Sequence, residues 1–164
     1  MTEIESFLLR ESGWVPNNER LPVIVYRSVL EGEGSDLAER FEALFEENGW
    51  PPDWRDSVFD YHHYHSTAHE ALGVFAGRAT LELGGPDGRQ VEVAAGDALM
   101  LPVGTGHRCV DASEDFQVVG AYPQGSSWDI CREAPDDAAR ARITALPDPR
   151  RDPATGETGT RTGA

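Results

Sequence analysis

The sequence predicts an all-β protein, either a sandwich or a closed jelly-roll barrel, with one or two peripheral helices. Between residues 57 and 122, short strand-like segments alternate with Gly-rich turns, which is typical of antiparallel sandwiches and barrels. Strong helical periodicity is found in one stretch, residues 35–48. With 164 residues, the chain is long enough to bury one hydrophobic core.

The segments before residue 57 are predicted to form early strands and one helix. Strands are expected at Ser6–Arg10 and at Val23–Leu30, and the second is rich in β-branched residues. Ser35 is the expected N-cap of a helix over residues 35–48, which Gly49 ends. One apolar stripe at helical spacing is expected to pack against the outside of the barrel: Leu37, Phe41, Leu44 and Phe45.

A hairpin and two further strands are predicted in the second half of the chain. The Gly-rich turn at residues 84–88 separates Ala79–Leu83 from Arg89–Val93, which indicates a hairpin. Further strands are expected at Ala98–Leu101 and Phe116–Ala121.

The C-terminal part is predicted to hold a short helix and a tail. Pro135 favours the start of a helix that runs to about Leu146. Beyond it, Pro, Gly, Thr, Asp and Arg dominate, so residues 147–164 are predicted to be disordered. The prediction is therefore one domain over residues 1–146 with a disordered tail.

Two segments carry residues with the spacing of a metal site. The first contains His63, His65 and, after four further residues, Glu70; the second contains His107 behind the turn-like run 102–106. Imidazole together with carboxylate suits Fe, Mn, Ni, Zn, Cu or Co better than Ca or Mg. We therefore expect one divalent transition metal bound by these four side chains.

The register of the first segment requires an irregularity. In a strand, His63 and His65 project from the same face, roughly 6–7 Å apart at Cα. Glu70 lies an odd number of residues beyond His65, so residues 66–68 must hold a turn or bulge for Glu70 to face inward. Without it, His69 takes the inward position in place of Glu70.

Aromatic residues are candidates for the surroundings of the site. Phe59 and Tyr61 share the strand parity of His63 and are predicted either to line a pocket or to belong to the core. A tyrosine there is able to donate a hydrogen bond to a metal-bound ligand. Tyr122 and Trp128 are predicted either to close the mouth of the barrel or to pack as ordinary aromatic residues.

Three other residues lie close to the predicted ligands in the sequence, and two of them have two interpretations each. Cys109 shares the parity of His107 and is either a soft group near the metal or a small buried thiol. Asp111 either orients His107 through its second ring nitrogen or caps a turn. His62 alternates away from His63 and is expected to face away from the metal.

The two segments resemble the two signature motifs of the cupin superfamily, with every ligand position filled. Ser57 stands where the first motif usually opens with Gly, and Asp111 where the second usually closes with Asn. The runs 15–22, 62–70 and 119–123, with Trp128-Asp129, look like those of the YjlB-like cupins. The resemblance covers residues 6–131 and implies a small β-barrel with a bound metal, commonly a homodimer, but no particular reaction.

Composition excludes several classes of partner. The net charge is −15, and all 14 basic residues are Arg, so the surface repels nucleic acid and anionic membranes. The missing Lys indicates either a GC-rich genome or adaptation to high salt. Two cysteines make no disulfide framework, the start is acidic, and no apolar run is long enough to span a bilayer. A cytoplasmic location is therefore expected.

Two classes of function fit these residues. The first is a metalloenzyme acting on a small organic molecule, of dioxygenase, isomerase or decarboxylase type, because three His and one Glu leave positions open on the metal. The second is a non-catalytic, metal-dependent binding module for a small ligand. A structural role like that of seed-storage cupins is a remote third. The early strands leave edges that need covering, so a homodimer is expected.

Overall fold

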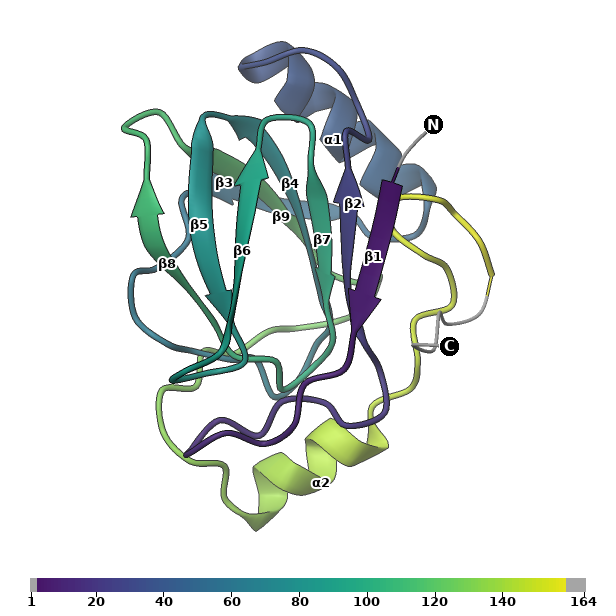
Figure 1. Ribbon diagram of the computed structural model, residues 1–164. Helices are drawn as coiled ribbons and strands as arrows, with labels where there is room; N and C mark the ends of the chain where they lie inside the picture. Colours follow the sequence, from purple (N-terminus) through teal and green to yellow (C-terminus); the bar gives the residue numbers. More distant parts are fainter. Residues whose placement is uncertain (1–2, 159–164) are drawn as a thin grey trace.

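The computed structural model describes residues 3–158, which form two antiparallel sheets and two helices (Figure 1). The strands are β1 (Glu3–Phe7), β2 (Val23–Arg27), β3 (Pro52–Asp56), β4 (Glu70–Ala76), β5 (Arg78–Leu83), β6 (Arg89–Ala94), β7 (Ala98–Leu101), β8 (His107–Ala112) and β9 (Gln117–Ala121), and the helices are α1 (Ser35–Glu47) and α2 (Asp137–Ala145). One sheet has the order β1-β2-β7-β4-β9-β3, and the other has the order β6-β5-β8.

The predicted all-β fold with two peripheral helices is confirmed, but the barrel is not closed. Within residues 3–158 neither sheet pairs with the other by strand hydrogen bonds. The sheets instead face each other across a core of aliphatic side chains, so the architecture is a sandwich. The side chains of this core include Val25, Leu72, Leu81, Leu99 and Val118.

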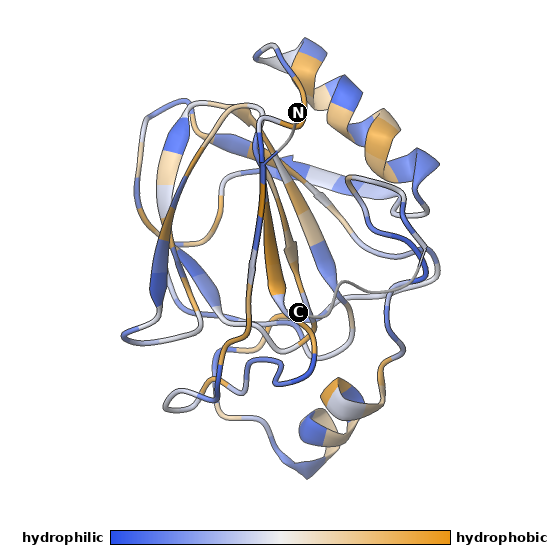
Figure 2. Ribbon diagram, turned by 45° about the vertical axis from the view of Figure 1, so that its right-hand side comes forward, coloured by the Kyte–Doolittle hydropathy of each residue, from blue (hydrophilic) through white to orange (hydrophobic). Residues whose placement is uncertain are grey.

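Strand β4 carries the core on both of its faces. Leu72 and Val74 point between the sheets, whereas Ala71 and Phe75 lie under α1. This explains why all but the last residue of β4 is buried. Figure 2 shows hydrophobic residues along the central strands and alternating hydrophobic and hydrophilic residues along α1.

Helix α1 covers the outer face of the larger sheet, as predicted. Its residues Leu37, Phe41 and Phe45 are fully buried there, and Leu44 is half-buried. Gly73 of β4 allows the close approach, because a Cβ at this position would lie 2.6 Å from Phe41 Cγ. The predicted cap is wrong: Gly34 is the N-cap and Ser35 begins the helix.

Helix α2 packs beneath one end of the sandwich (Figure 1). Its N-cap, Asp136, accepts a hydrogen bond from Ala139 N at 2.8 Å. Ile143 forms a small cluster with Tyr64 and Val103. The helix therefore supports the segment that holds His63 and His65. No helix within residues 3–158 is long and apolar enough to cross a bilayer.

One strand differs from its predicted position, and another strand was not predicted. The first strand runs over Glu3–Phe7 rather than Ser6–Arg10. Strand β3 was not predicted, because Pro51 and Pro52 indicate a helix end. Pro52 is tolerated since it begins an edge strand, where its missing N–H leaves no ladder bond unmade.

The predicted disorder of the tail is wrong for residues 147–158. Pro149, Asp152 and Pro153 are buried, and the segment satisfies three side chains of the main fold. The contacts are Tyr26 Oη to Asp152 Oδ2 at 2.6 Å, Asn48 Nδ2 to Pro153 O at 2.7 Å and Trp50 Nε1 to Arg151 O at 2.9 Å. Residues 159–164 lie outside the described part of the chain.

A chain that ends at residue 149 should be much less stable than one that ends at residue 158. The shorter chain removes the acceptors of the Asn48 and Trp50 side chains and one partner of Tyr26. Each buried polar group left unpaired costs about 1–3 kcal/mol, so the free energy of unfolding should fall by several kcal/mol. Urea titration of both chains measures it, and equal midpoints would show that the segment contributes nothing.

Candidate metal centre

The four predicted ligands converge at one end of the space between the sheets. Glu70 and His107 are the first residues of β4 and β8, and both strands begin at the end where α2 lies (Figure 1). Ligand nitrogens of His63, His65 and His107 lie within 4.8 Å of one another. The Glu70 carboxylate lies 3.2 Å from His65 Nε2 and 3.1 Å from His107 Nε2. All four side chains are buried.

Backbone pairing places two of the imidazoles side by side. His63 and His107 form an isolated antiparallel bridge, with hydrogen bonds of 3.2 Å from His63 N to His107 O and 2.9 Å from His107 N to His63 O. Their ring centroids are 4.0 Å apart. The bridge therefore joins the first predicted segment directly to the second.

Backbone carbonyl groups fix the orientation of all three rings. The contacts are His63 Nδ1 to Tyr61 O at 3.0 Å, His107 Nδ1 to Thr105 O at 3.0 Å and His65 Nδ1 to Asp129 O. A carbonyl oxygen only accepts, so each Nδ1 must carry the hydrogen. Nε2 is consequently the nitrogen of each ring that is available to a metal.

The carboxylate of Glu70 has one satisfied oxygen and one free oxygen. Oε2 accepts a hydrogen bond from Tyr122 Oη at 2.6 Å. Oε1 is buried, and no hydrogen bond to it is found among residues 3–158; His107 Nε2 lies 3.1 Å from it. A buried acceptor without a donor is costly unless a cation satisfies it.

The residues present therefore fit a divalent transition metal. Three imidazole nitrogens and one carboxylate oxygen face the same small space, and their lone pairs repel one another unless a positive charge lies between them. Such a set of N and O ligands is typical of Zn and of the neighbouring transition metals. His63, His65, Glu70 and His107 are the residues able to hold the ion.

The predicted irregularity before β4 is confirmed, and it decides between Glu70 and His69. Ser66 and Thr67 form a bend, so Glu70 faces the three imidazoles. His69 faces the other way: its Nδ1 accepts from Val103 N at 3.0 Å, and its Nε2 lies 2.9 Å from Pro147 O. With both ring nitrogens engaged, His69 is excluded as the fourth ligand.

Burial and mutual charge set the protonation states in the site. Burial, with the neighbouring His107 acting in the same direction, lowers the pKa of His63 to about 3. Burial alone would raise the pKa of Glu70, but His65 and His107 hold it well below its usual range. Burial would lower the pKa of His65, but the Glu70 charge outweighs it and raises that pKa. Neutral His63 and ionised Glu70 are the forms that bind metal.

A cavity of about 330 Å³ leads to the four residues. Its walls include four aromatic residues besides the histidines: Trp54, Phe59, Tyr122 and Trp128. Tyr122 and Trp128 stack at 5.5 Å between ring centroids. For Phe59, the structure decides between pocket and core in favour of the pocket. Tyr61 does not line the cavity, and instead stacks on Phe59 at 4.8 Å. An aromatic-lined cavity of this size is suited to a small molecule.

A further wall residue, Trp54, depends on a glycine in the neighbouring strand. A Cβ on Gly120 would lie 2.1 Å from Trp54 Cε2, so only glycine leaves room for the indole. Trp54 Nε1 donates to Tyr122 Oη at 2.9 Å, and Tyr122 in turn donates to Glu70. This chain of hydrogen bonds holds the carboxylate in one orientation.

The structure places the remaining predicted residues away from the four ligands. Asp111 is exposed and paired with Thr80, so the first of its two interpretations, that it orients His107, does not hold; Thr105 O has that role. Cys109 is a half-buried thiol packed against the core, and burial raises its pKa. His62 lies 3.4 Å from Glu82 Oε1 and faces away, as predicted.

Sequence reasoning did not identify Trp54, Thr105 or Asp129 as residues that shape the site. Thr105 and Asp129 act on the histidines through backbone carbonyls, which any residue type supplies and which therefore leave no sequence signal. Trp54 belongs to β3, whose Pro-rich start hid the strand. The pairing of Trp54 with Gly120 is visible only in the structure.

The sequence is similar to those of several known proteins. No protein-family model matches the chain. Protein YjlB of Bacillus subtilis (strain 168), itself uncharacterized, is 36% identical over 157 residues, which cover 94% of this chain and 92% of YjlB. Acireductone dioxygenase of Nostoc sp. (strain PCC 7120) is 33% identical over 103 residues, but these span only 57% of that enzyme and 54% of this chain.

Among solved structures, a cupin 2 domain-containing protein of Halorhodospira halophila aligns with 88% of this chain and 77% of its own. The identity is 12% and the TM-score is 0.33. A likeness this weak adds nothing to the description of the site.

Replacing Tyr122 by Phe should destabilise the protein through the site rather than through packing. The variant removes one partner of Glu70 Oε2, which keeps His65 Nε2 at 3.2 Å, and removes the acceptor of Trp54 Nε1; a buried donor left unpaired costs about 1–3 kcal/mol. Urea unfolding measures the loss. Tyr61→Phe is the control, since no hydrogen bond of its hydroxyl is found within residues 3–158; equal losses in both variants would contradict the assigned role.

Proposed function

This chain belongs to the YjlB-like family of cupin-type proteins, and we propose that it binds one divalent transition metal through His63, His65, Glu70 and His107. The observation that carries the proposal is the convergence of three imidazoles, each oriented by a backbone carbonyl, on a buried carboxylate oxygen that has no donor. The two facing sheets would then be the halves of a cupin jelly roll.

We further propose that the centre is catalytic and acts on a small organic molecule, in a reaction of dioxygenase, isomerase or decarboxylase type. A metal bound there would polarise an oxygen of the substrate or activate water or O₂. The partial alignment with an acireductone dioxygenase supports the dioxygenase type.

The residues of the chain have separate tasks in this proposal. Tyr122, held by Trp54, keeps Glu70 Oε2 occupied and leaves Oε1 for the metal. The aromatic walls exclude water from the inner end of the cavity, where electrostatic interactions become stronger. Asp53, Asp56 and Ser57 lie in the lining as polar groups for the substrate.

One observation favours the alternative of a non-catalytic, metal-dependent binding module. Apart from the four ligands, the ionisable groups of the described lining are Asp53, Asp56 and Tyr122. The two aspartates are exposed, and burial together with the Glu70 charge raises the pKa of Tyr122. The inner cavity thus offers no obvious proton acceptor apart from the metal ligands. Turnover of a bound compound distinguishes the two functions.

Replacing His107 by Ala should weaken metal binding, whereas replacing His62 by Ala should not. Loss of one of four ligands should lower affinity by more than the roughly 10–100-fold typical of a residue that only orients a ligand. His62 faces Glu82 instead of the centre, so it controls for a general histidine effect. Elemental analysis after zinc loading should give about one ion per chain for the His62→Ala protein; the same content in both variants would contradict the assignment.

The expected homodimer remains a proposal supported by exposed sheet edges. β1 and β3 are the edge strands of the larger sheet, and the residues of β1 are exposed or half-buried. Edges of this kind are commonly covered by a partner. Light scattering at micromolar concentrations should give twice the 17.9 kDa chain mass; the monomer mass throughout would contradict the proposal.

A further inference from the structure

The mouth of the cavity presents aromatic rings to solvent. Phe59 is 45% exposed and Trp128 is 38% exposed, although both line the cavity. Apolar groups left exposed around a cavity are typical of a binding site rather than of a core. Aromatic faces also attract positively charged groups through the ring quadrupole.

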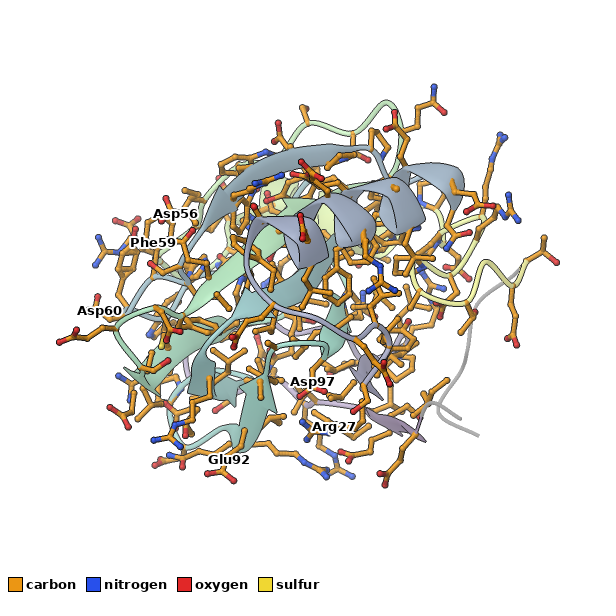
Figure 3. All side chains as sticks on the ribbon, turned by 90° about the horizontal axis from the view of Figure 1, so that it is seen from above. Arg27, Asp56, Phe59, Asp60, Glu92 and Asp97 are labelled. Carbon is orange, nitrogen blue, oxygen red and sulfur yellow. The ribbon has the colours of Figure 1, made fainter. Side chains whose placement is uncertain are left out.

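Carboxylates lie beside these rings. Asp53 and Asp56 both line the cavity and are exposed. Asp53 accepts a hydrogen bond from Trp128 Nε1, and Asp56 Oδ1 accepts one from Ser57 N at 2.7 Å. Figure 3 shows Asp56, Phe59 and Asp60 gathered on one side of the molecule. The aromatic groups and the negative charges are therefore parts of the same rim.

No arginine side chain balances the Asp53 and Asp56 charges in the described lining. Among residues 3–158, no arginine lines the cavity, and the arginines of nearby segments have other contacts. Arg55 pairs with Glu42 at 2.7 Å, Arg108 pairs with Glu82 at 2.8 Å, and Arg132 lies 3.6 Å from the ring centre of Tyr61. A carboxylate or phosphate would meet repulsion at this mouth.

The inner end of the cavity holds a further carboxylate, Glu70, which lies 3.2 Å from His65 Nε2. Glu70 lines it, is 2% exposed and has the unpaired atom Oε1. The negative groups are therefore of two kinds: a buried one that suits a metal ion, and an exposed pair beside aromatic faces. A hydrated metal ion gains little from aromatic faces, whereas an organic ammonium gains from both features.

We infer that the pocket takes a small organic cation, an amine or quaternary ammonium on an apolar body, with its positive nitrogen between the Asp53 and Asp56 carboxylates and the rings of Phe59 and Trp128. The apolar body extends inward past Trp54, Leu72 and Tyr122. The inference rests on the proposed function in so far as this molecule is the substrate or ligand of the metal centre.

Three probes of similar size and different charge test the inference: benzylammonium, benzyl alcohol and benzoate. Dissociation constants are measured by ligand-observed NMR, with zinc-loaded and with chelator-treated protein. Benzylammonium should bind about tenfold more tightly than benzyl alcohol in both states, from the combined cation–π and ionic contacts. Tightest binding of benzoate by the chelator-treated protein would overturn the inference.

Charge-removing variants locate the effect. Asp53→Asn and Asp56→Asn keep an oxygen to accept the existing hydrogen bonds, and each should weaken benzylammonium binding about twofold to fivefold while leaving benzyl alcohol unchanged. Asp60→Asn is the matched control, because Asp60 is exposed in the same segment but does not line the cavity. Phe59→Leu should likewise weaken benzylammonium more than benzyl alcohol.

The outcomes separate this inference from the proposed metal centre. If zinc does not bind but the mouth variants weaken benzylammonium as expected, the cation site stands and the metal proposal fails. If zinc binds at about one ion per chain and the mouth variants equal Asp60→Asn, the metal proposal stands and the cation site fails.

Discussion

The antiparallel bridge between His63 and His107 is the contact on which the candidate site depends. It joins the smaller sheet, through the first residue of β8, to the segment that leads into β4 of the larger sheet. Because both partners of the bridge are histidines, the same pair of backbone hydrogen bonds that links the segments also brings two imidazoles together. Each Nδ1 donates a hydrogen bond to a backbone carbonyl oxygen, so the Nε2 atoms face the space between the ligands.

The fourth candidate ligand, Glu70, is positioned by a bend in the chain and by side-chain hydrogen bonds. The bend at Ser66 and Thr67 changes which face of the chain points inward, and the Trp54–Tyr122 hydrogen bonds then hold the carboxylate. The indole fits because Gly120 has no side chain. One consequence is that the wall of the cavity and the orientation of the carboxylate are not independent. A change that displaces Trp54 should therefore affect both the pocket and the centre at its inner end.

Much of this could be predicted from the sequence, and the failures have physical reasons. The hairpin of β5 and β6 and the helix α1 follow from local periodicity and turn residues. For the fourth ligand, periodicity left Glu70 and His69 open, and the bend at Ser66 and Thr67 decides for Glu70. The ordered structure of residues 147–158 does not follow from local sequence. It arises because the buried side chains of Tyr26 and Trp50, which are far away in the sequence, need polar partners. Asp111 was a candidate for the role of Thr105 because a carboxylate is visible in a sequence and a backbone carbonyl is not. Strand spacing left a sandwich and a closed barrel open, because it does not determine whether facing sheets share hydrogen bonds; the resemblance to cupins implied the barrel.

The most direct test of the centre is X-ray absorption spectroscopy of the protein loaded with one equivalent of a divalent transition metal. We expect a light-atom coordination sphere with the scattering pattern of three imidazoles plus oxygen ligands, since three histidines and Glu70 face the same space. Sulfur scattering from Cys109 or Cys131, or fewer than two imidazoles, would contradict it.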